Sequence, residues 1–356
     1  KKMKIKDMKQ PQSTDRRKVL KGMAGTTALS TLGFPAIVSA SAPLVVNSYG
    51  GAFEKFIRSE IIPDFESSTG IKTKLDINLG KGWLTTLRAA GPENPPYDVL
   101  MTNETWASVE RGEGFFEAIP EDKVPNMADL YPVARYKDNI AVIGMLSPLG
   151  LLYRTDMVPE PKSWEDLWTV PEYRGKTGLY TVTNSAGYMT ILMTARNWFG
   201  SEYEVDKAID KLKELKPFLQ ADFGGTMEKY LIRGEVAIAP ADFAAKGRMI
   251  SKGIGGPVEV IAPKEGMFCW EQVFNVLKGS KKKEEGYQWI NYILDPDVQA
   301  KFVVGLSQAP VNKKAQVPAD FQGIHGERMN EIVMWDWATA NSIRDHVIER
   351  WNKEMR

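Results

Sequence analysis

Cysteine and histidine are almost absent from the sequence, which contains one cysteine, Cys269, and two histidines, His325 and His346, in 356 residues. A single cysteine excludes an internal disulfide bond. Zinc sites are built mainly from cysteine and histidine at short spacings, and no such spacing occurs. Adjacent tyrosines, whose phenolate oxygens suit a hard cation such as ferric iron, are missing as well. The sequence therefore predicts neither a metal site nor a cofactor.

Motifs for nucleotide phosphates are also missing, because neither a G-x-G-x-x-G nor a Walker G-x-x-x-x-G-K-[ST] sequence occurs. Gly50-Gly51 stands between a predicted strand and a predicted helix, where backbone N–H groups could approach an anion. The alternative is a tight turn that needs a positive φ. No apolar run is long enough to predict a membrane-spanning helix.

Residues 1–40 differ in composition from the rest of the chain. Lysines are frequent at the start, and residues 15–21 (Asp-Arg-Arg-Lys-Val-Leu-Lys) resemble a twin-arginine export signal. Residues 22–38 are small or mildly apolar, and no cysteine that could carry a lipid lies nearby. We expect residues 1–40 to be a signal peptide, cleaved after Ala40 rather than Ala42, of a periplasmic protein. The alternative is a basic tail on a cytosolic protein.

The charge of the chain argues against nucleic acid as a partner. The whole sequence has a formal net charge of +1. Residues 1–40 hold nine basic and two acidic residues, which leaves 37 basic and 43 acidic residues, a net charge of −6, in the remainder. A protein without a basic surface lacks the electrostatic attraction that binds phosphate backbones.

Strands and helices alternate from Leu44 onward. The pattern predicts strands at 44–46, 71–77 and 99–101, with a helix from Phe53 to a stop at Gly70 and another at 83–90 between them. Such alternation with short loops predicts a parallel, doubly wound sheet. Ligands of these sheets bind at loops that follow the strands, here Ser48–Gly51 and Thr102–Trp106.

The second half continues in the same style. We expect strands at 140–146, 151–154, 179–182 and 236–239, and helices that begin at Asn184 or Ser185, at Val205 and at Gly225, followed by a long helix over 328–353. Ser163 and Asp166 are spaced as a capping box. Roughly 315 residues remain after the leader, which is more than one hydrophobic core usually serves, so we expect two lobes.

Residues 262–312 combine turn chemistry with an aromatic ring, a carboxylate and an amide. Trp270, Glu271 and Gln272 stand before a predicted strand at 273–277. An amphipathic helix follows, and Pro296 is placed as the first residue of another helix that ends at Gly305. This composition is typical of a strand end that contacts a ligand, although an edge strand with a half-exposed tryptophan is the alternative.

Three motifs in order carry a resemblance to a known family. They are Ser163–Trp168 with Pro171–Gly175, then Gly234–Val236, and then Trp270 with Leu294-Asp-Pro-Asp-Val298, Gly305 and Pro310-x-Asn312. The chain from about Leu44 to its end resembles periplasmic substrate-binding proteins of ABC importers, especially the spermidine/putrescine-binding type.

The resemblance implies an α/β, two-lobed periplasmic-binding-protein fold of type II. Each lobe would be a doubly wound sheet with flanking helices, and the ligand cleft would lie between the lobes. It implies that lobe one comprises 41–142 plus 271–310 and lobe two 143–270 plus 311–356, with passages near Ile143, Trp270 and Pro310. The implied partners are a membrane permease and an ATPase, with the receptor itself a monomer.

The resemblance also implies the ligand-binding residues. They fall on loops of both lobes and on the stretch around Trp270: Ser48, Tyr49, Gly50, Asn103, Trp106, Asn184, Ser185, Asp242, Trp270, Glu271, Gln272 and Asp336. Trp270 matches the stacking tryptophan of the polyamine binders. Gln272 stands where those proteins have a carboxylate, and Glu271 is one residue early. Asn184 and Ser185 also stand where they have acids.

These departures bear on the ligand, because a desolvated ammonium group must be paired with an acid or lie over a ring. We expect a small amine or zwitterion, such as a polyamine or γ-aminobutyrate, with Asp242 or Asp336 and Trp270 holding one amine. An anionic or other small organic solute is an alternative. A Cys269-dependent enzyme acting on a thiamin-like substrate, and a chemoreceptor partner without transport, are two further alternatives. We expect no enzyme activity.

Overall fold

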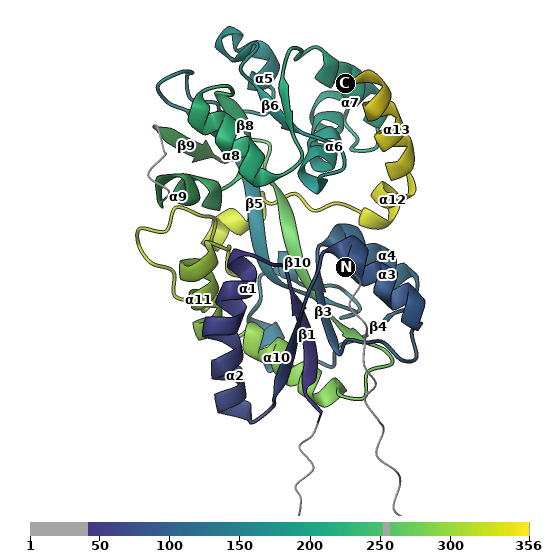
Figure 1. Ribbon diagram of the computed structural model, residues 1–356. Helices are drawn as coiled ribbons and strands as arrows, with labels where there is room; N and C mark the ends of the chain where they lie inside the picture. The colour runs from purple at the N-terminus through teal and green to yellow at the C-terminus, as the bar shows by residue number, and fades with distance from the viewer. Residues whose placement is uncertain (1–41, 252–256, 356) are drawn as a thin grey trace, which may run out of the picture. The chain divides into compact units, whose positions relative to one another are not determined.

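The computed structural model describes residues 42–251 and 257–355 (Figure 1). The signal peptide predicted for residues 1–40 lies outside the described residues. Within the described ranges, no helix combines the length and the apolar character needed to cross a membrane.

The chain begins with the predicted alternation of strands and helices. The order is β1 (Leu44–Ser48), α1 (Ala52–Phe56), a π-helical turn (Ile57–Ile61), α2 (Ile62–Thr69), β2 (Thr73–Ile77), α3 (Gly80–Ala90), β3 (Val99–Thr102) and α4 (Glu104–Gly112). β1 and β2 pair in parallel. The Asn47 side chain joins β1 to β3, because its Nδ2 donates to Met101 O at 2.8 Å and its Oδ1 accepts from Met101 N at 2.6 Å.

Two long antiparallel strands form the centre of the largest sheet. β10 (Phe268–Leu277) lies between β3 and β5 (Val142–Arg154) and also pairs with β4 (Phe116–Glu117). The far half of β5 pairs with β8 (Ile238–Asp242) and β9 (Val258–Ile261). The strands of this sheet therefore pair antiparallel, whereas the alternation of elements predicted parallel strands alone.

β5 is one strand of 13 residues, and the prediction of two separate strands is wrong. Pro148 and Gly150 interrupt the sequence pattern but not the strand. Pro148 pairs with Cys269 of β10, just before the pairing with β8 begins at Leu149. Gly150 allows a close approach, because a Cβ atom there would lie 2.0 Å from Ile261 O.

The middle of the chain supplies a second group of helices and a small sheet. Its elements are α5 (Asp166–Thr169), β6 (Gly178–Tyr180), α6 (Ser185–Phe199), α7 (Val205–Lys213), β7 (Leu219–Ala221), α8 (Gly224–Arg233) and α9 (Ala244–Ser251). β6 and β7 pair in parallel. The predicted capping box is half present: Asp166 Oδ2 accepts from Ser163 N at 3.0 Å, but Ser163 Oγ accepts from Glu165 N at 3.1 Å.

After β10 the chain forms α10 (Lys283–Ile293) and α11 (Pro296–Leu306), as predicted, and then a 3-10 turn (Gly326–Glu331), α12 (Trp337–Ser342) and α13 (Arg344–Glu354). The single long helix predicted over 328–353 is wrong. Residues 332–336 are extended, because Met267 donates to Glu331 O at 2.9 Å and accepts from Val333 N at 2.7 Å. Asp336 then starts α12, and Ile343 separates α12 from α13.

The described residues contain two hydrophobic cores. The first core includes Leu146 and Val99–Met101 of β3, and the second includes Leu149 and most of α6. β10 contributes to both, through Cys269 to the first and Phe268 to the second. Near the C-terminus, Ile332 belongs to the first core and Trp335 to the second. β5, β10 and the segment 332–335 therefore connect the cores, and the lobe boundaries given above stay a prediction.

Candidate functional site

Four of the predicted site residues meet near the start of β10. Trp270 Nε1 donates to Ser185 Oγ at 2.9 Å, and Asn103 Nδ2 donates to the Glu271 carbonyl oxygen at 3.0 Å. Ser185 is the first residue of α6, and Asn103 precedes α4. The starts of a helix from each core therefore flank residues 270–271, which we call the interlobe junction. Trp270, Glu271 and Gln272 lie inside β10 rather than before it, and Trp270 is the one β10 residue that is not buried.

Glu271 is a buried acid at this junction, with 1% of its surface exposed. Trp337 Nε1 donates to its Oε1 at 3.5 Å. Burial, reinforced by the negative charge of Glu104, raises the pKa of Glu271 to about 8. Glu271 therefore carries a proton at neutral pH in this state. A cation that came into contact with it would favour loss of that proton.

Gln272 has its side chain on the opposite face of β10 from Glu271, because strand residues alternate. It is 4% exposed, and its Oε1 has no hydrogen-bond partner among the described residues. In the neighbouring strand, Ser147 stands opposite Trp270 and donates from Oγ to Gln308 Oε1 at 2.5 Å. Gln272, next to the junction, thus has an amide oxygen that no described residue hydrogen-bonds.

Asp242 is buried and already has a cationic partner. Arg248 donates to its two oxygens at 2.9 and 2.6 Å, and also from Nε to Glu228 Oε1 at 2.8 Å. Its location at the end of β8 is the loop position that the sequence predicted. The carboxylate is nevertheless half of a bidentate ion pair and does not stand ready for an ammonium group.

Asp336 is exposed and caps α12. Its oxygens accept from Ala338 N at 3.1 Å, from Thr339 N at 3.2 Å and from Thr339 Oγ1 at 2.6 Å. The bonds from Thr339 hold the pKa of Asp336 below its usual value. The structure does not bring Asp336 to the residues that surround Trp270, although its neighbour Trp337 reaches Glu271.

The first loop also serves local structure. Ser48 is buried and donates to Tyr49 O at 3.0 Å, and the Tyr49 ring packs 5.4 Å from Trp83. The Tyr49 hydroxyl is buried without a partner among the described residues. Gly50 is exposed, and Gly51 has a φ of 72°, the conformation that a tight turn requires. α1 begins directly after this turn and has only five residues.

Asn184 caps α6, as predicted: its Oδ1 accepts from Ala186 N at 2.9 Å, and its Nδ2 donates to Asp222 O at 3.1 Å. The cap fixes the start of α6, and with it Ser185 beneath Trp270. Asn184 thus affects the junction indirectly, because it caps the helix whose first residue, Ser185, contacts Trp270.

The C-terminal segment supplies contacts that the sequence did not predict. Asn341 Nδ2 donates to Thr105 O at 2.9 Å and to Ser108 Oγ at 2.8 Å, both in α4. Tyr188 of α6 donates from Oη to Ala340 O at 2.5 Å. The segment 337–344 therefore contacts α4 and α6 together. The helix predicted over 328–353 gave no reason to expect these contacts of residues 337–344 with α4 and α6.

Arg344 completes this group. Its guanidinium carbon lies 5.4 Å from the centre of the Trp106 ring and 5.8 Å from the centre of the Tyr188 ring. Trp106, a predicted site residue, thus faces a cation that comes from the other end of the chain.

The sequence also has known relatives. The sequence matches the family described as "Bacterial extracellular solute-binding protein" over residues 60–325. The chain belongs to this family.

Two relatives and one structure show how this solute-binding protein compares. It is 26% identical over 285 residues to the putrescine-binding periplasmic protein PotF of Escherichia coli, across 73% of this chain and 76% of that protein. It is 24% identical over 308 residues to a gamma-aminobutyric acid-binding protein of Pseudomonas aeruginosa, across 80% and 82%. The structure of an ABC transporter protein from Clostridium perfringens superposes with a TM-score of 0.78 at 25% identity, across 88% of this chain and 100% of that one. The predicted two-lobed type II fold is confirmed.

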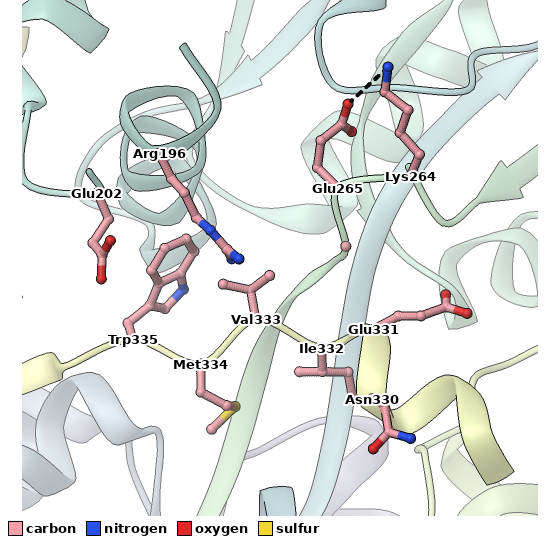
Figure 2. A pocket seen from close by; sticks show the side chains of 11 residues that line it. Arg196, Glu202, Lys264, Glu265, Asn330, Glu331, Ile332, Val333, Met334 and Trp335 are labelled. Carbon is pink, nitrogen blue, oxygen red and sulfur yellow. Dashed lines mark ion pairs between the residues drawn. The ribbon is translucent and has the colours of Figure 1, made fainter. Parts of the chain in front are cut away.

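The solute-binding protein also has a cavity of about 650 Å³ outside the junction (Figure 2). It is lined by Arg196, Glu202, Lys264, Glu265, Gly266, Asn330, Glu331, Ile332, Val333, Met334 and Trp335, none of which the sequence predicted as site residues. Its charged groups have both signs, and Lys264 lies 3.7 Å from Glu265.

Neither a metal centre nor a reactive thiol forms in the described residues of the solute-binding protein. In the ranges 42–251 and 257–355, no three His, Cys, Asp or Glu side chains are grouped so that they could hold a metal ion. Cys269 is fully buried, and its Sγ lies 3.4 Å from Trp270 O. Burial and the nearby Glu271 raise the pKa of the Cys269 thiol well above its ordinary value. Cys269 therefore stays protonated and is a poor nucleophile.

Proposed function

We propose that this protein captures a small amine or zwitterion, polyamine-like or γ-aminobutyrate-like, between its two lobes. It delivers this solute to the permease and ATPase of an ABC importer, and works as a monomer in the periplasm. The observation that carries the proposal is the partly exposed Trp270 between the starts of α4 and α6, beside the buried acid Glu271. The names of the relatives, which bind putrescine and gamma-aminobutyric acid, support the same class of solute.

Aromatic faces and acids together are what an ammonium group needs when it leaves water. Trp270 supplies the ring, and Gln272, whose Oε1 has no partner among the described residues, offers an acceptor on the same face of β10. The Glu271 carboxyl lies on the opposite face of the strand. Asp242 is neutralised by Arg248, and Asp336 caps a helix, so neither supports a second ammonium group. This favours a solute with one ammonium group over a diamine. The protonated thiol of Cys269 supports a receptor rather than an enzyme.

The test is a calorimetric titration of the protein with 4-aminobutyrate and with putrescine, repeated on Trp270→Ala and Trp270→Phe. We expect the alanine variant to bind at least about 10-fold more weakly, since a cation–π contact and a stacking surface are lost. The phenylalanine variant, which loses the bond to Ser185 but keeps a ring, should lie between the two. Undiminished affinity in Trp270→Ala, or no binding of either compound to the wild type, would refute the proposal.

A further inference from the structure

Arg344 is a partly buried cation that forms no ion pair within the described ranges. It is the first residue of α13, and its guanidinium lies between the rings of Trp106 and Tyr188. Its Nε is buried and has no hydrogen-bond partner, and the side chain forms no ion pair with any described residue. Burial lowers the pKa of Arg344, and the charges of Tyr188 and Asp345 offset only part of this effect.

The other arginines show that this arrangement is an exception. Each remaining arginine that is not fully exposed in the described ranges contacts a carboxylate: Arg111, Arg135, Arg154, Arg248 and Arg350. Desolvating a charge without a counter-charge costs free energy, so proteins seldom do it unless the partner comes from elsewhere. A guanidinium with rings near it still presents its N–H edge, and that edge fits a carboxylate.

Arg344 is anchored to the interlobe junction from both sides. Tyr188 lies one turn after Ser185, whose Oγ accepts from Trp270, and Trp106 follows Asn103, which donates to Glu271 O. α12, just before Arg344, lies beside α4 (Figure 1). Asn341 of α12 donates hydrogen bonds to α4. The unpaired cation therefore lies between the same two helices whose starts flank Trp270.

We propose that Arg344 binds the carboxylate of the solute, and that the protein therefore selects an ω-amino acid over a diamine of the same length. This inference rests on the proposed function and narrows its substrate class. The ammonium end of the solute is held at Trp270, and the carboxylate end forms a bidentate pair with Arg344. The same edge would attract any free carboxylate, so the test must separate a solute from a simple anion.

The experiment measures dissociation constants of the full chain for 4-aminobutyrate, putrescine and butyrate by calorimetry. Arg344→Gln should weaken 4-aminobutyrate at least about 30-fold, because removing one partner of a close charge pair has effects of this size. Putrescine should bind Arg344→Gln as well as or better than the wild type, since a cation has been removed. Butyrate, which lacks the ammonium group, should bind the wild type far more weakly than 4-aminobutyrate. Arg350→Gln on the same helix, where the arginine pairs with Asp206 and Asp210, is the matched control and should change no affinity.

The outcomes separate the two proposals. Equal losses of 4-aminobutyrate and putrescine in Arg344→Gln would mean that Arg344 only ties α4 to α6, and the inference would fall. A wild type that prefers putrescine, or butyrate binding as tightly as 4-aminobutyrate, would also overturn it while leaving a solute receptor. A wild type that binds neither amine would end the proposed function itself. If Arg344→Gln does not fold, Arg344→Lys keeps the charge without the planar edge and should weaken 4-aminobutyrate alone by about 5- to 10-fold.

Discussion

At the scale of the residue, Glu271 makes the protein sensitive to pH. Its pKa is raised to about 8 in the folded chain, mainly by burial, whereas an unfolded chain gives a glutamate its ordinary lower value. Between these two values the folded state binds more protons than the unfolded state. The contribution of Glu271 to stability is therefore fully present in acid and is lost as the pH rises toward 8.

We expect Glu271→Gln to remove most of this dependence. At pH 8.5 the variant should unfold with a free energy roughly 3–5 kcal/mol higher than the wild type, because a glutamine has no charge to bury. Near pH 4 the difference should vanish. Urea titrations at both pH values measure it, and a residual slope is expected from Glu110, whose pKa burial also raises to about 8.

Glu113→Gln is the control for this variant. Arg88 holds the pKa of Glu113 below its usual value, so the folded state stabilises the negative charge of Glu113. This substitution should not stabilise the protein at pH 8.5. Equal slopes for Glu271→Gln and the wild type would show that Glu271 is not the buried acid responsible.

Residue identities alone led part of the way to the site. The family resemblance predicted Trp270, and the loop positions predicted Asn103 and Ser185. In the structure these residues lie together at residues 270–271. The state of Asp242 was out of reach, because its partner Arg248 lies six residues away on a helix whose facing is not visible in the sequence. Arg344 was missed for a similar reason: its neighbours Trp106 and Tyr188 are remote along the chain.

At the scale of the element, the local patterns predicted helices well where caps were present. α11 begins at Pro296 and α6 is capped by Asn184, as the sequence indicated. They failed where tertiary pairing overrides periodicity. Residues 332–336 and α12 together show an apolar spacing that resembles one continuous helix. Hydrogen bonds to Met267 nevertheless hold residues 332–336 extended. β5 was split for the opposite reason, because Pro148 and Gly150 look like a turn.

Gly150 in β5 offers a test of this tertiary constraint. Gly150→Ala should destabilise the protein by about 2–4 kcal/mol, since the added Cβ would meet Ile261 O at 2.0 Å and force β9 away from β5. Gly247→Ala is matched to it: nothing lies within 4 Å of a Cβ on that α9 residue. That control should be neutral or stabilising by up to about 1 kcal/mol.

Urea unfolding of the two variants compares them directly. A Gly150→Ala protein as stable as Gly247→Ala would show that β9 can shift without a loss of stability. In that case close backbone packing would not explain why glycine stands in the middle of a buried strand.

At the scale of the whole molecule, length and alternation predicted an α/β protein with two lobes, and the structure has two cores. What the sequence could not predict is how firmly they are joined. β5 has buried residues in both cores, and β10 does too. Periodicity describes one element at a time, so a strand shared by two cores leaves no distinct pattern.

This sharing predicts one cooperative thermal transition rather than two. Unfolding either core would break β5 and β10, which the other core needs, so the two should melt together. A solute bound at the junction then stabilises the whole described chain: at 100 times its dissociation constant it adds about 2.7 kcal/mol, which raises the midpoint by several degrees. Scanning calorimetry with and without 4-aminobutyrate measures both effects, and Trp270→Ala at the same concentration should show about half of this shift or less. Two transitions, of which the solute moves only one, would mean that the cores unfold independently and that β5 and β10 do not couple them.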